Sequence, residues 1–424
     1  MLMHHFHDAR DWFFRHRYGL FLHWGLYAVG GLHEQELSRY GTSWEAYLKY
    51  QEAFDPVKFN PAEWLDLAQR NGMEYVVFTA KHHDGFCMWD TKETEFNVMH
   101  TPYGRDVLRE LADECHRRRM PLVLYYSVVD WHHPNYPNLG RHHELVTDPA
   151  HHDVNRYLQF LKNQLRELCT DYGEIHGIWW DMNVPEIHDP SVNAMIRELQ
   201  PAAVINNRGC DAGDFSTPER HFQKDPTLPF ANPTEACNSV GVNSWGYRVR
   251  EDYYTAGALE RQLASNMALG GNYLLNVGPK PDGTIPEEAA ALLESVGGWF
   301  RKVSSALTAA PCAGVLESKA ILCTGGGTEL NLIVTEPLTS GTLKLAPLNI
   351  LPEKAVLLNT GEEVEATLEP IVYERQNPPV LRLRGIPAER LCGTVPVFRL
   401  TFRDPVIRGS GAVSENSAGI HAKE

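Results

Sequence analysis

The sequence predicts an α/β fold, a (β/α)8-like TIM barrel followed by a C-terminal antiparallel β-sandwich. From about residue 12 to 305, apolar strand-like runs alternate with helical periodicity, as in βα units repeated around a parallel sheet. Several of these runs end in polar side chains, and the ends of the strands are where a TIM barrel keeps its chemistry. After Trp299 the pattern changes to short alternating runs separated by Gly, Pro and Asn, which is typical of an antiparallel sandwich.

We place the catalytic barrel at residues 1–305, the sandwich at 306–404 and a polar tail, expected to be disordered, at 405–424. The six strongest apolar runs are expected barrel strands: residues 18–24, 75–80, 122–128, 177–180, 204–207 and 273–277. Weaker runs near residues 215–219 and 236–240 complete the count of eight.

Helices and sandwich strands follow from periodicity and from stop signals such as Asn71-Gly72. The predicted helices are residues 61–71, 105–119, 154–172, 190–199 and 258–269. The predicted sandwich strands lie in residues 320–324, 329–334, 341–345, 355–358, 380–383 and 397–402.

Composition excludes several classes of protein. The formal charge of -15 disfavours a nucleic-acid partner, because phosphate binding needs a basic surface. No apolar run reaches the length of a membrane span, and the N-terminus does not read as a secretory signal, so no membrane partner is expected. The eight cysteines have no CxxC spacing, which favours reduced thiols and a cytoplasmic location.

Asp181 is the most informative residue of the chain. It ends the apolar run 177–180 and therefore lies at the C-terminal tip of a predicted barrel strand, beside Trp179 and Trp180. An isolated aspartate after a strand often only caps the next helix. The polar residues at the ends of the other strands favour a functional role instead.

Histidines and tryptophans gather at the same strand ends. His23, His82 and His83 suggest either a metal site or hydrogen bonding to a polyhydroxylated ligand. Adjacent residues of a strand point in opposite directions, which argues against His82 and His83 binding one ion, so neither a metal nor another cofactor is expected. Six tryptophans are candidates to stack on a sugar ring: Trp24, Trp89, Trp131, Trp179, Trp180 and Trp245.

Several motifs, in this order, resemble the α-L-fucosidases of glycoside hydrolase family 29. They are Phe-Leu-His-Trp-Gly-Leu-Tyr from Phe21, Thr-Ala-Lys-His-His-Asp-Gly-Phe from Thr79, Gly-Ile-Trp-Trp-Asp from Gly177, Asn-Asn-Arg from Asn206, Ser-Trp-Gly-Tyr from Ser244 and Gly-Asn-Tyr-Leu-Leu-Asn-Val-Gly-Pro from Gly271. The resemblance covers about residues 12 to 305. It implies a retaining fucosidase with a TIM-like barrel, no metal, a fucosylated glycoside as substrate, and Asp181 as the nucleophile.

The resemblance also assigns a fucose-binding shell: His23, Glu34, His82, His83, one of Tyr125 and Tyr126, Trp179 and Arg208. Two positions depart from the family pattern. Gln35 stands where a tryptophan usually follows the glutamate, and Thr234 stands where a tryptophan usually precedes Glu235. Because Gln35 replaces a tryptophan, the structure of one wall of the sugar site cannot be inferred from the resemblance.

Two glutamates compete for the role of general acid and base. Glu219 and Glu235 both lie in segments that resemble those supplying this residue in different family members, and Glu219 is preferred. A retaining enzyme needs a carboxyl about 5 to 5.5 Å from the nucleophile. Three other readings stay open at this stage: a metal-dependent TIM-barrel hydrolase, a catalytically inactive fucose-binding protein, and a glycosidase for a related sugar.

Overall fold

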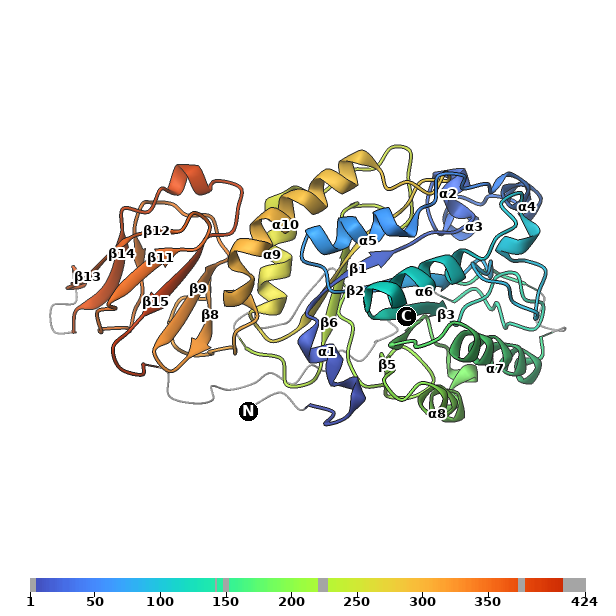
Figure 1. Cartoon of the computed structure of the whole chain (residues 1–424), viewed down its shortest axis with the longest axis horizontal. Helices are drawn as coiled ribbons and strands as arrows, with labels where there is room; N and C mark the ends of the chain where they lie inside the picture. The colour runs from blue at the N-terminus through green and yellow to red at the C-terminus, as the bar shows by residue number, and fades with distance from the viewer. Residues whose placement is uncertain (1–4, 142, 148–151, 220–227, 373–377, 407–424) are drawn as a thin grey trace.

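The computed structural model describes residues 5–141, 143–147, 152–219, 228–372 and 378–406. Figure 1 shows helices around a parallel sheet in the N-terminal part, and antiparallel strands at the other end of the molecule. Helices α9 (Ala256–Met267) and α10 (Glu287–Leu307) lie between the two parts (Figure 1). The expected disordered tail lies outside the described residues from residue 407 onward.

The N-terminal part is built on a seven-stranded sheet with the order β5-β4-β3-β2-β1-β7-β6, in which every neighbouring pair is parallel. Nearly all strand residues are buried, as expected where helices cover one face and the barrel interior the other. The strands are β1 (Tyr18–Leu22), β2 (Tyr75–Lys81), β3 (Leu122–Ser127), β4 (Gly177–Asp181), β5 (Val204–Ile205), β6 (Glu235–Ser239) and β7 (Asn272–Val277). The six strong runs and the weak run near residues 236–240 are confirmed as strands.

The eighth position of the barrel is filled without a continuous strand. Residues 215–219 form isolated parallel bridges, first to Asn206 beyond β5 and then to Thr234 and Cys237 at β6. Carbonyls of Ser216 and Pro218 accept hydrogen bonds from the backbone of β6. Because Pro218 has no N–H to donate, a regular ladder is interrupted there. The run near residues 215–219 therefore lies where a strand was expected, but only as bridges.

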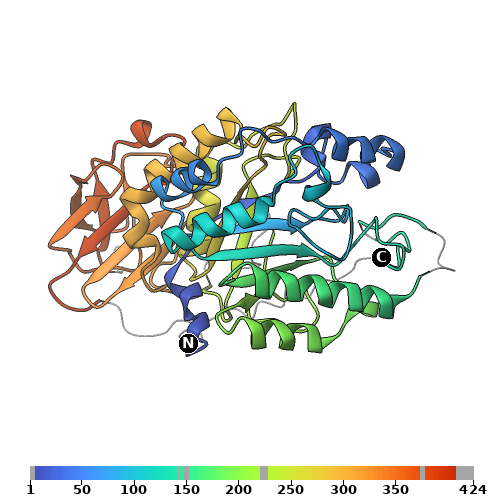
Figure 2. The ribbon, with the colours of Figure 1, turned by 45° about the vertical axis from the view of Figure 1, so that its right-hand side comes forward.

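Helices cover the outside of the sheet (Figures 1 and 2). All five predicted helices are present, shifted at their ends by up to two residues: α5 (Pro61–Arg70), α6 (Val107–Arg118), α7 (Val154–Asp171), α8 (Pro190–Leu199) and α9. Each begins after a residue whose side chain accepts a backbone N–H of the first turn: Asn60, Asp106, Asp153, Asp189 and Thr255. Such caps satisfy donors that the helix itself leaves unpaired.

Short helices near the N-terminus are not predicted from the sequence. They are α1 (Trp12–Arg15), α2 (Tyr27–Gly30), α3 (Glu36–Arg39) and α4 (Trp44–Ala53). Three of them have only four residues, too few to show a helical period. The segment from α2 to α3, which contains residues 33–39, follows the carboxyl end of β1 in the chain.

The C-terminal part has a three-stranded sheet, β10-β14-β13, and a five-stranded sheet, β12-β11-β15-β9-β8, both antiparallel. The strands are β8 (Ile321–Gly326), β9 (Glu329–Val334), β10 (Leu343–Lys344), β11 (Lys354–Leu357), β12 (Glu362–Glu363), β13 (Glu365–Glu369), β14 (Val380–Arg384) and β15 (Val397–Thr401). Residues of both sheets, including Leu332 and Leu381, share one apolar core. The predicted sandwich is confirmed, with β12 and β13 as additional strands.

The two parts share a packed junction. Leu322, Ile333 and Val397 of the sandwich belong to the same apolar core as the barrel. Trp299 of α10 donates its indole N–H to the carbonyl of Val395 at 2.9 Å. The proposed boundary between residues 305 and 306 falls in the last turn of α10, a helix that contacts both parts.

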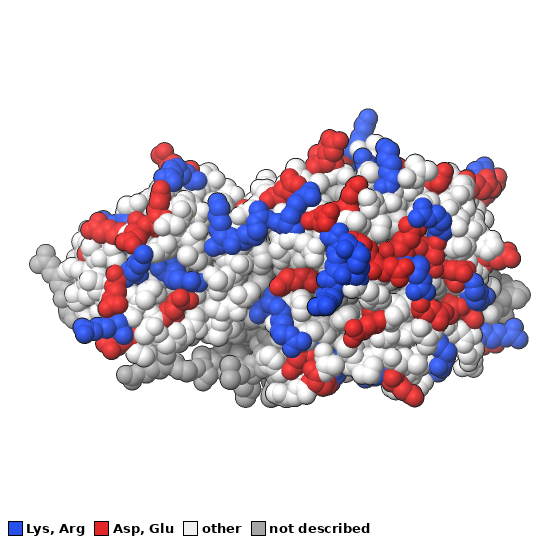
Figure 3. Space-filling model, viewed as in Figure 1, with Lys and Arg blue, Asp and Glu red and all other residues white. Residues whose placement is uncertain are grey.

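Surface charge is mixed on the face shown in Figure 3, where acidic and basic side chains lie next to one another over both parts. None of the described helices is long and apolar enough to cross a membrane.

Candidate active site

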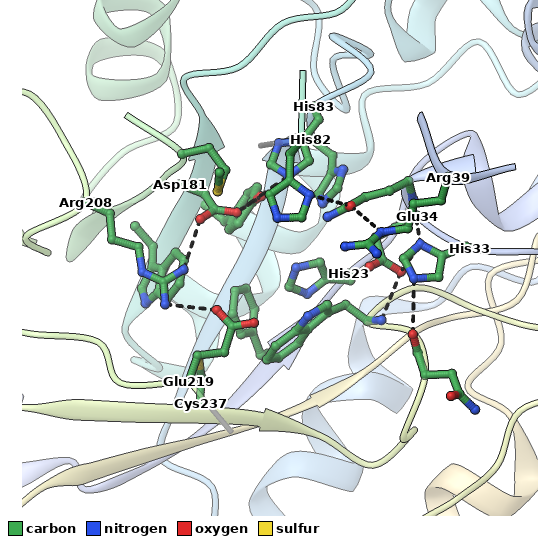
Figure 4. Close-up of a pocket in the computed structure, with 18 residues that line it drawn as sticks. His23, His33, Glu34, Arg39, His82, His83, Asp181, Arg208, Glu219 and Cys237 are labelled. Atoms are coloured by element: carbon green, nitrogen blue, oxygen red, sulfur yellow. Dashed lines mark hydrogen bonds and ion pairs between the residues drawn. The ribbon is translucent and has the colours of Figure 1, made fainter. Parts of the chain in front are cut away.

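A cavity of about 360 Å³ opens at the carboxyl ends of the parallel strands. Nine of the predicted site residues line it: His23, Glu34, His82, His83, Tyr125, Trp179, Asp181, Arg208 and Glu219. Figure 4 shows Asp181, Arg208 and Glu219 on one side, His33, Glu34 and Arg39 on the other, and His23 between them. The cavity thus joins residues that are almost 200 positions apart in the chain.

Asp181 ends β4 and has three close polar neighbours. Its Oδ2 accepts a hydrogen bond from the Tyr125 hydroxyl at 2.8 Å, its Oδ1 accepts one from Arg208 Nη1 at 3.0 Å, and His83 Nε2 lies 3.8 Å from Oδ2. Burial alone would raise the pKa of Asp181, but the charge of Arg208 and the hydrogen bond from Tyr125 outweigh it and hold the pKa below its ordinary value. The carboxyl group is therefore ionised at neutral pH.

Arg208 links Asp181 to Glu219. While Nη1 contacts Asp181, Nη2 donates to Glu219 Oε2 at 3.0 Å. The guanidinium is fixed by Thr217, whose hydroxyl and carbonyl accept at 2.8 and 2.9 Å, and it lies 4.8 Å above the Trp179 ring. The side chain of Asp181 is 14% exposed and that of Glu219 is 37% exposed, so the aspartate lies deeper and the glutamate nearer to solvent.

The environments of His83 and His23 define which ring nitrogen carries a proton. The Ser127 hydroxyl donates to the carbonyl of Val129, so it must accept from His83 Nδ1, at 2.6 Å. The amide nitrogen of Asn276 donates to two oxygens, so its Oδ1 accepts from His23 Nδ1, at 2.7 Å. Both rings are therefore protonated at Nδ1, which leaves Nε2 as an acceptor. Burial lowers the pKa of each to about 4, which keeps both neutral at pH 7.

His82 and His83 both line the cavity, with ring centroids 4.2 Å apart. The expectation that they would point in opposite directions is wrong, because β2 has an irregular register between Thr79 and Lys81 and ends at Lys81. Burial and the neighbouring histidines hold the pKa of His82 well below its ordinary value. Its ring is stacked on Tyr125, 5.6 Å away and nearly parallel.

Glu34 organises one wall of the cavity. Its Oε2 accepts from the Ser244 hydroxyl at 2.5 Å and from the backbone N–H groups of Trp245 and Gly246 at 3.0 and 3.2 Å. Burial would raise the pKa of Glu34, but the hydrogen bonds that its carboxylate accepts, among them the Ser244 bond, outweigh it and the pKa is lowered. The ionised carboxylate thereby fixes the loop that presents Trp245 to the cavity.

Gln35, the position at which the chain departs from the family pattern, also lines the cavity. Its Oε1 accepts from Arg39 Nε and from His143 Nδ1, both at 2.7 Å. The wall in question is therefore polar. His33, Arg39 and His143 also line the cavity but are not predicted from the sequence, because they lie in segments with neither strand nor helix periodicity.

Two predicted residues do not line the cavity. Tyr126 points to the opposite side of β3, where its hydroxyl donates to Gln164 at 2.7 Å, so Tyr125 is the tyrosine of the site. Glu235 lies beneath Trp179 and accepts from its indole N–H at 3.0 Å and from the Tyr75 hydroxyl at 2.6 Å. Burial raises the pKa of Glu235 to about 7.

Of the six tryptophans that were candidates to stack on a sugar, Trp179 and Trp245 line the cavity. Trp24, Trp89, Trp131 and Trp180 are buried in the packing of the barrel instead. Trp180 follows Trp179 on the same strand and must face the other way, where its indole donates to Asn193 at 3.0 Å. Among the described residues, no three His, Cys, Asp or Glu side chains are grouped to hold a metal ion.

Comparisons with known proteins point to one family. The α-L-fucosidase isoenzyme 1 of Paenibacillus thiaminolyticus is 33% identical with a TM-score of 0.80, covering 94% of this chain and 100% of that one. A GH29 α-L-fucosidase of Bacteroides thetaiotaomicron, solved as a trapped covalent intermediate with 2-fluoro-fucosyl fluoride, is 28% identical with a TM-score of 0.76, covering 93% and 96%. The tissue α-L-fucosidase of Bos taurus is 27% identical over 409 residues, 87% of this chain and 85% of that one.

A sequence profile described as Alpha-L-fucosidase matches residues 4–305, which hold the barrel and every residue of the cavity. With the shared fold, this match shows that the chain belongs to the α-L-fucosidases of glycoside hydrolase family 29.

Proposed function

We propose that the protein is a retaining exo-α-L-fucosidase in which Asp181 is the nucleophile and Glu219 the general acid and base. The observation that carries these roles is the Arg208 bridge, which places an ionised, deeply set aspartate and a more exposed glutamate in one cavity. Terminal α-L-fucosyl units of glycosides or oligosaccharides are the proposed substrates. One guanidinium contacting both carboxyl groups is compatible with the separation of about 5 to 5.5 Å in retaining enzymes.

In the first step, a carboxylate oxygen of Asp181 attacks the anomeric carbon and the glycosidic C–O bond breaks. The proton of Glu219 passes to the departing oxygen, so the aglycone leaves as an alcohol. In the second step, Glu219 takes a proton from water, whose oxygen attacks the same carbon and releases Asp181. Two inversions leave the α configuration of the fucose unchanged.

Contacts around Asp181 support its role. Tyr125 and Arg208 donate to the carboxylate and keep it ionised without occupying all of its lone pairs. When the covalent ester forms, the negative charge leaves Asp181, and Arg208 retains Glu219 as its anionic partner. The guanidinium is therefore suited to stabilise charge on either carboxyl group during the cycle.

The neutral histidines suit a sugar rather than a charged ligand. His23 and His83 each present an unprotonated Nε2, which can accept a hydrogen bond from a sugar hydroxyl. Trp245 and Trp179 supply apolar surface for the ring and its methyl group. Glu235 serves in this proposal as support for Trp179 rather than as the acid.

The test is hydrolysis of an aryl α-L-fucoside, followed by NMR of the sugar first released. We expect fucose in the α configuration before it equilibrates with the β anomer. A first product in the β configuration would overturn the double displacement. Binding of fucose without turnover would instead support the alternative of an inactive fucose-binding protein.

A further inference from the structure

A second cavity adjoins the catalytic one. It has a volume of about 430 Å³ and shares His33, Arg39 and Asn243 with the catalytic cavity. Its other lining residues are Tyr40, Arg248 and Asp252. Because the two spaces have three lining residues in common, they lie next to each other.

The outer cavity lies on the side away from the catalytic carboxyl groups. Figure 4 separates Asp181, Arg208 and Glu219 from His33 and Arg39, with His23 between the two groups. The strand order agrees, since β4 carries Asp181 whereas His33 and Arg39 follow β1, three strands away. In the proposed function C1 of the fucosyl ring lies at Asp181, and C3 and C4 are across the ring from C1, so a ring that spans the cavity turns its 3- and 4-hydroxyls toward His33 and Arg39. The outer cavity is therefore next to these hydroxyls and not next to the aglycone.

Two arginines give the outer cavity its charge. Arg39 uses its Nε to bind Gln35, and neither Arg39 nor Arg248 forms an ion pair with a described carboxylate. Burial lowers the pKa of His33, and the positive charges of Arg39 and Arg248 lower it further. This histidine is therefore neutral at pH 7. Asp252 is the one described carboxylate that lines the cavity, and its Oδ2 accepts from the Asn243 amide at 2.8 Å. Two positive charges thus face one negative charge in a chain of net charge -15.

Resting on the proposed function, we propose that the outer cavity accepts an anionic substituent, a sulfate ester, on the 3- or 4-hydroxyl of the fucosyl unit. Arg39 and Arg248 bind the sulfate oxygens. Gln35 lines the catalytic cavity and accepts from Arg39 Nε, which positions Arg39 at the border of the two cavities. The enzyme thus removes sulfated as well as unsubstituted terminal fucose.

The test compares aryl α-L-fucosides that are unsubstituted, 3-O- or 4-O-sulfated, or O-acetylated at the same positions. Acetyl is a neutral group that occupies the same hydroxyl, so the sulfate-to-acetyl ratio of kcat/KM isolates charge from size. We expect this ratio to exceed 1 at low ionic strength for at least one position and to fall as salt is added.

Substitutions at three residues of the outer cavity test whether its charge sets the sulfate-to-acetyl ratio, and a fourth substitution outside it is the control. Arg248→Gln should lower the sulfate-to-acetyl ratio by about two- to five-fold, the range expected for an exposed ion pair, and Arg39→Gln should lower it too. Asp252→Asn retains an acceptor for Asn243 and should raise the ratio. Arg250→Gln changes the net charge equally, but this exposed residue lines neither cavity, so the ratio should stay at the wild-type value.

The outcomes separate this inference from the proposed function. Cleavage of the unsubstituted fucoside with no cleavage of the sulfated ones overturns the inference and leaves the fucosidase in place. A ratio that Arg248→Gln and Asp252→Asn both leave unchanged does the same. If no fucoside is cleaved, the proposed function fails, and the inference fails with it.

Discussion

Replacement of the buried Glu235 by glutamine should remove a loss of stability that the protein suffers as the pH rises. Glu235 accepts hydrogen bonds from Tyr75 and Trp179, and burial raises its pKa from 4.5 to about 7. A raised carboxyl pKa means that the folded state binds the proton more tightly than the unfolded chain does. The resulting stability is fully present below pH 4.5 and is lost as the pH rises through about 7.

The size of the effect follows from the two pKa values. A difference between 4.5 and about 7, at about 1.4 kcal/mol for each pH unit, corresponds to about 3 kcal/mol. Glu235→Gln has nearly the same shape and cannot ionise. The free energy of unfolding of this variant, relative to wild type, should therefore increase by about 2 to 3 kcal/mol between pH 5 and pH 8.

Urea denaturation of both proteins at several pH values measures this difference. Other buried groups that titrate in the same range, such as Asp84, are present in both proteins and cancel in the comparison. Glu235→Leu is the contrasting variant: it leaves the Tyr75 hydroxyl and the Trp179 indole without an acceptor, which costs about 1 to 3 kcal/mol each at any pH. Parallel stability profiles for wild type and Glu235→Gln would refute the reasoning.

Three further predictions concern the chemistry. Asp181→Ala should lower turnover by about 1000-fold or more while the protein stays folded, and added azide should yield a β-fucosyl azide; residual activity above a tenth of wild type would defeat the assignment. Glu219→Ala should lose far more activity on a disaccharide than on a dinitrophenyl fucoside, which needs no proton to leave, and azide should give an α-fucosyl azide. If Glu235→Ala shows this pattern and Glu219→Ala does not, the acid is Glu235. Exhaustive chelation should leave full activity, and recovery of lost activity with one added metal would favour a metal-dependent hydrolase instead.

The strands, and the polar residues at their carboxyl ends, could be predicted from the sequence because both depend only on neighbouring residues. A buried parallel strand is an unbroken apolar run, and the polar residue that ends it, such as Asp181, is visible without any partner. An unbroken apolar run does not show which face of the sheet each side chain occupies. Because β3 is buried on both faces, nothing in its sequence shows that Tyr125 reaches the cavity and Tyr126 does not.

Other features depend on contacts between distant segments. Glu219 and Glu235 have similar sequence surroundings, and only packing shows that one lines the cavity while Trp179 covers the other. Gln35 and His143 meet across 108 positions of the chain, and neither belongs to a periodic element. The eighth barrel position was predicted as a strand, but Pro218 limits the pairing there to isolated bridges.

These bridges mean that the two proposed catalytic residues, Asp181 and Glu219, are anchored to the sheet in different ways. Asp181 pairs in register with Ser127 inside a continuous sheet, and a shift of one residue would turn it to the opposite face. Glu219 stands on a segment tied to its neighbours at single points, where the chain can gain or lose residues without breaking a ladder. The architecture thus fixes the proposed nucleophile by a continuous ladder, whereas the position of the proposed acid can tolerate insertions and deletions around it.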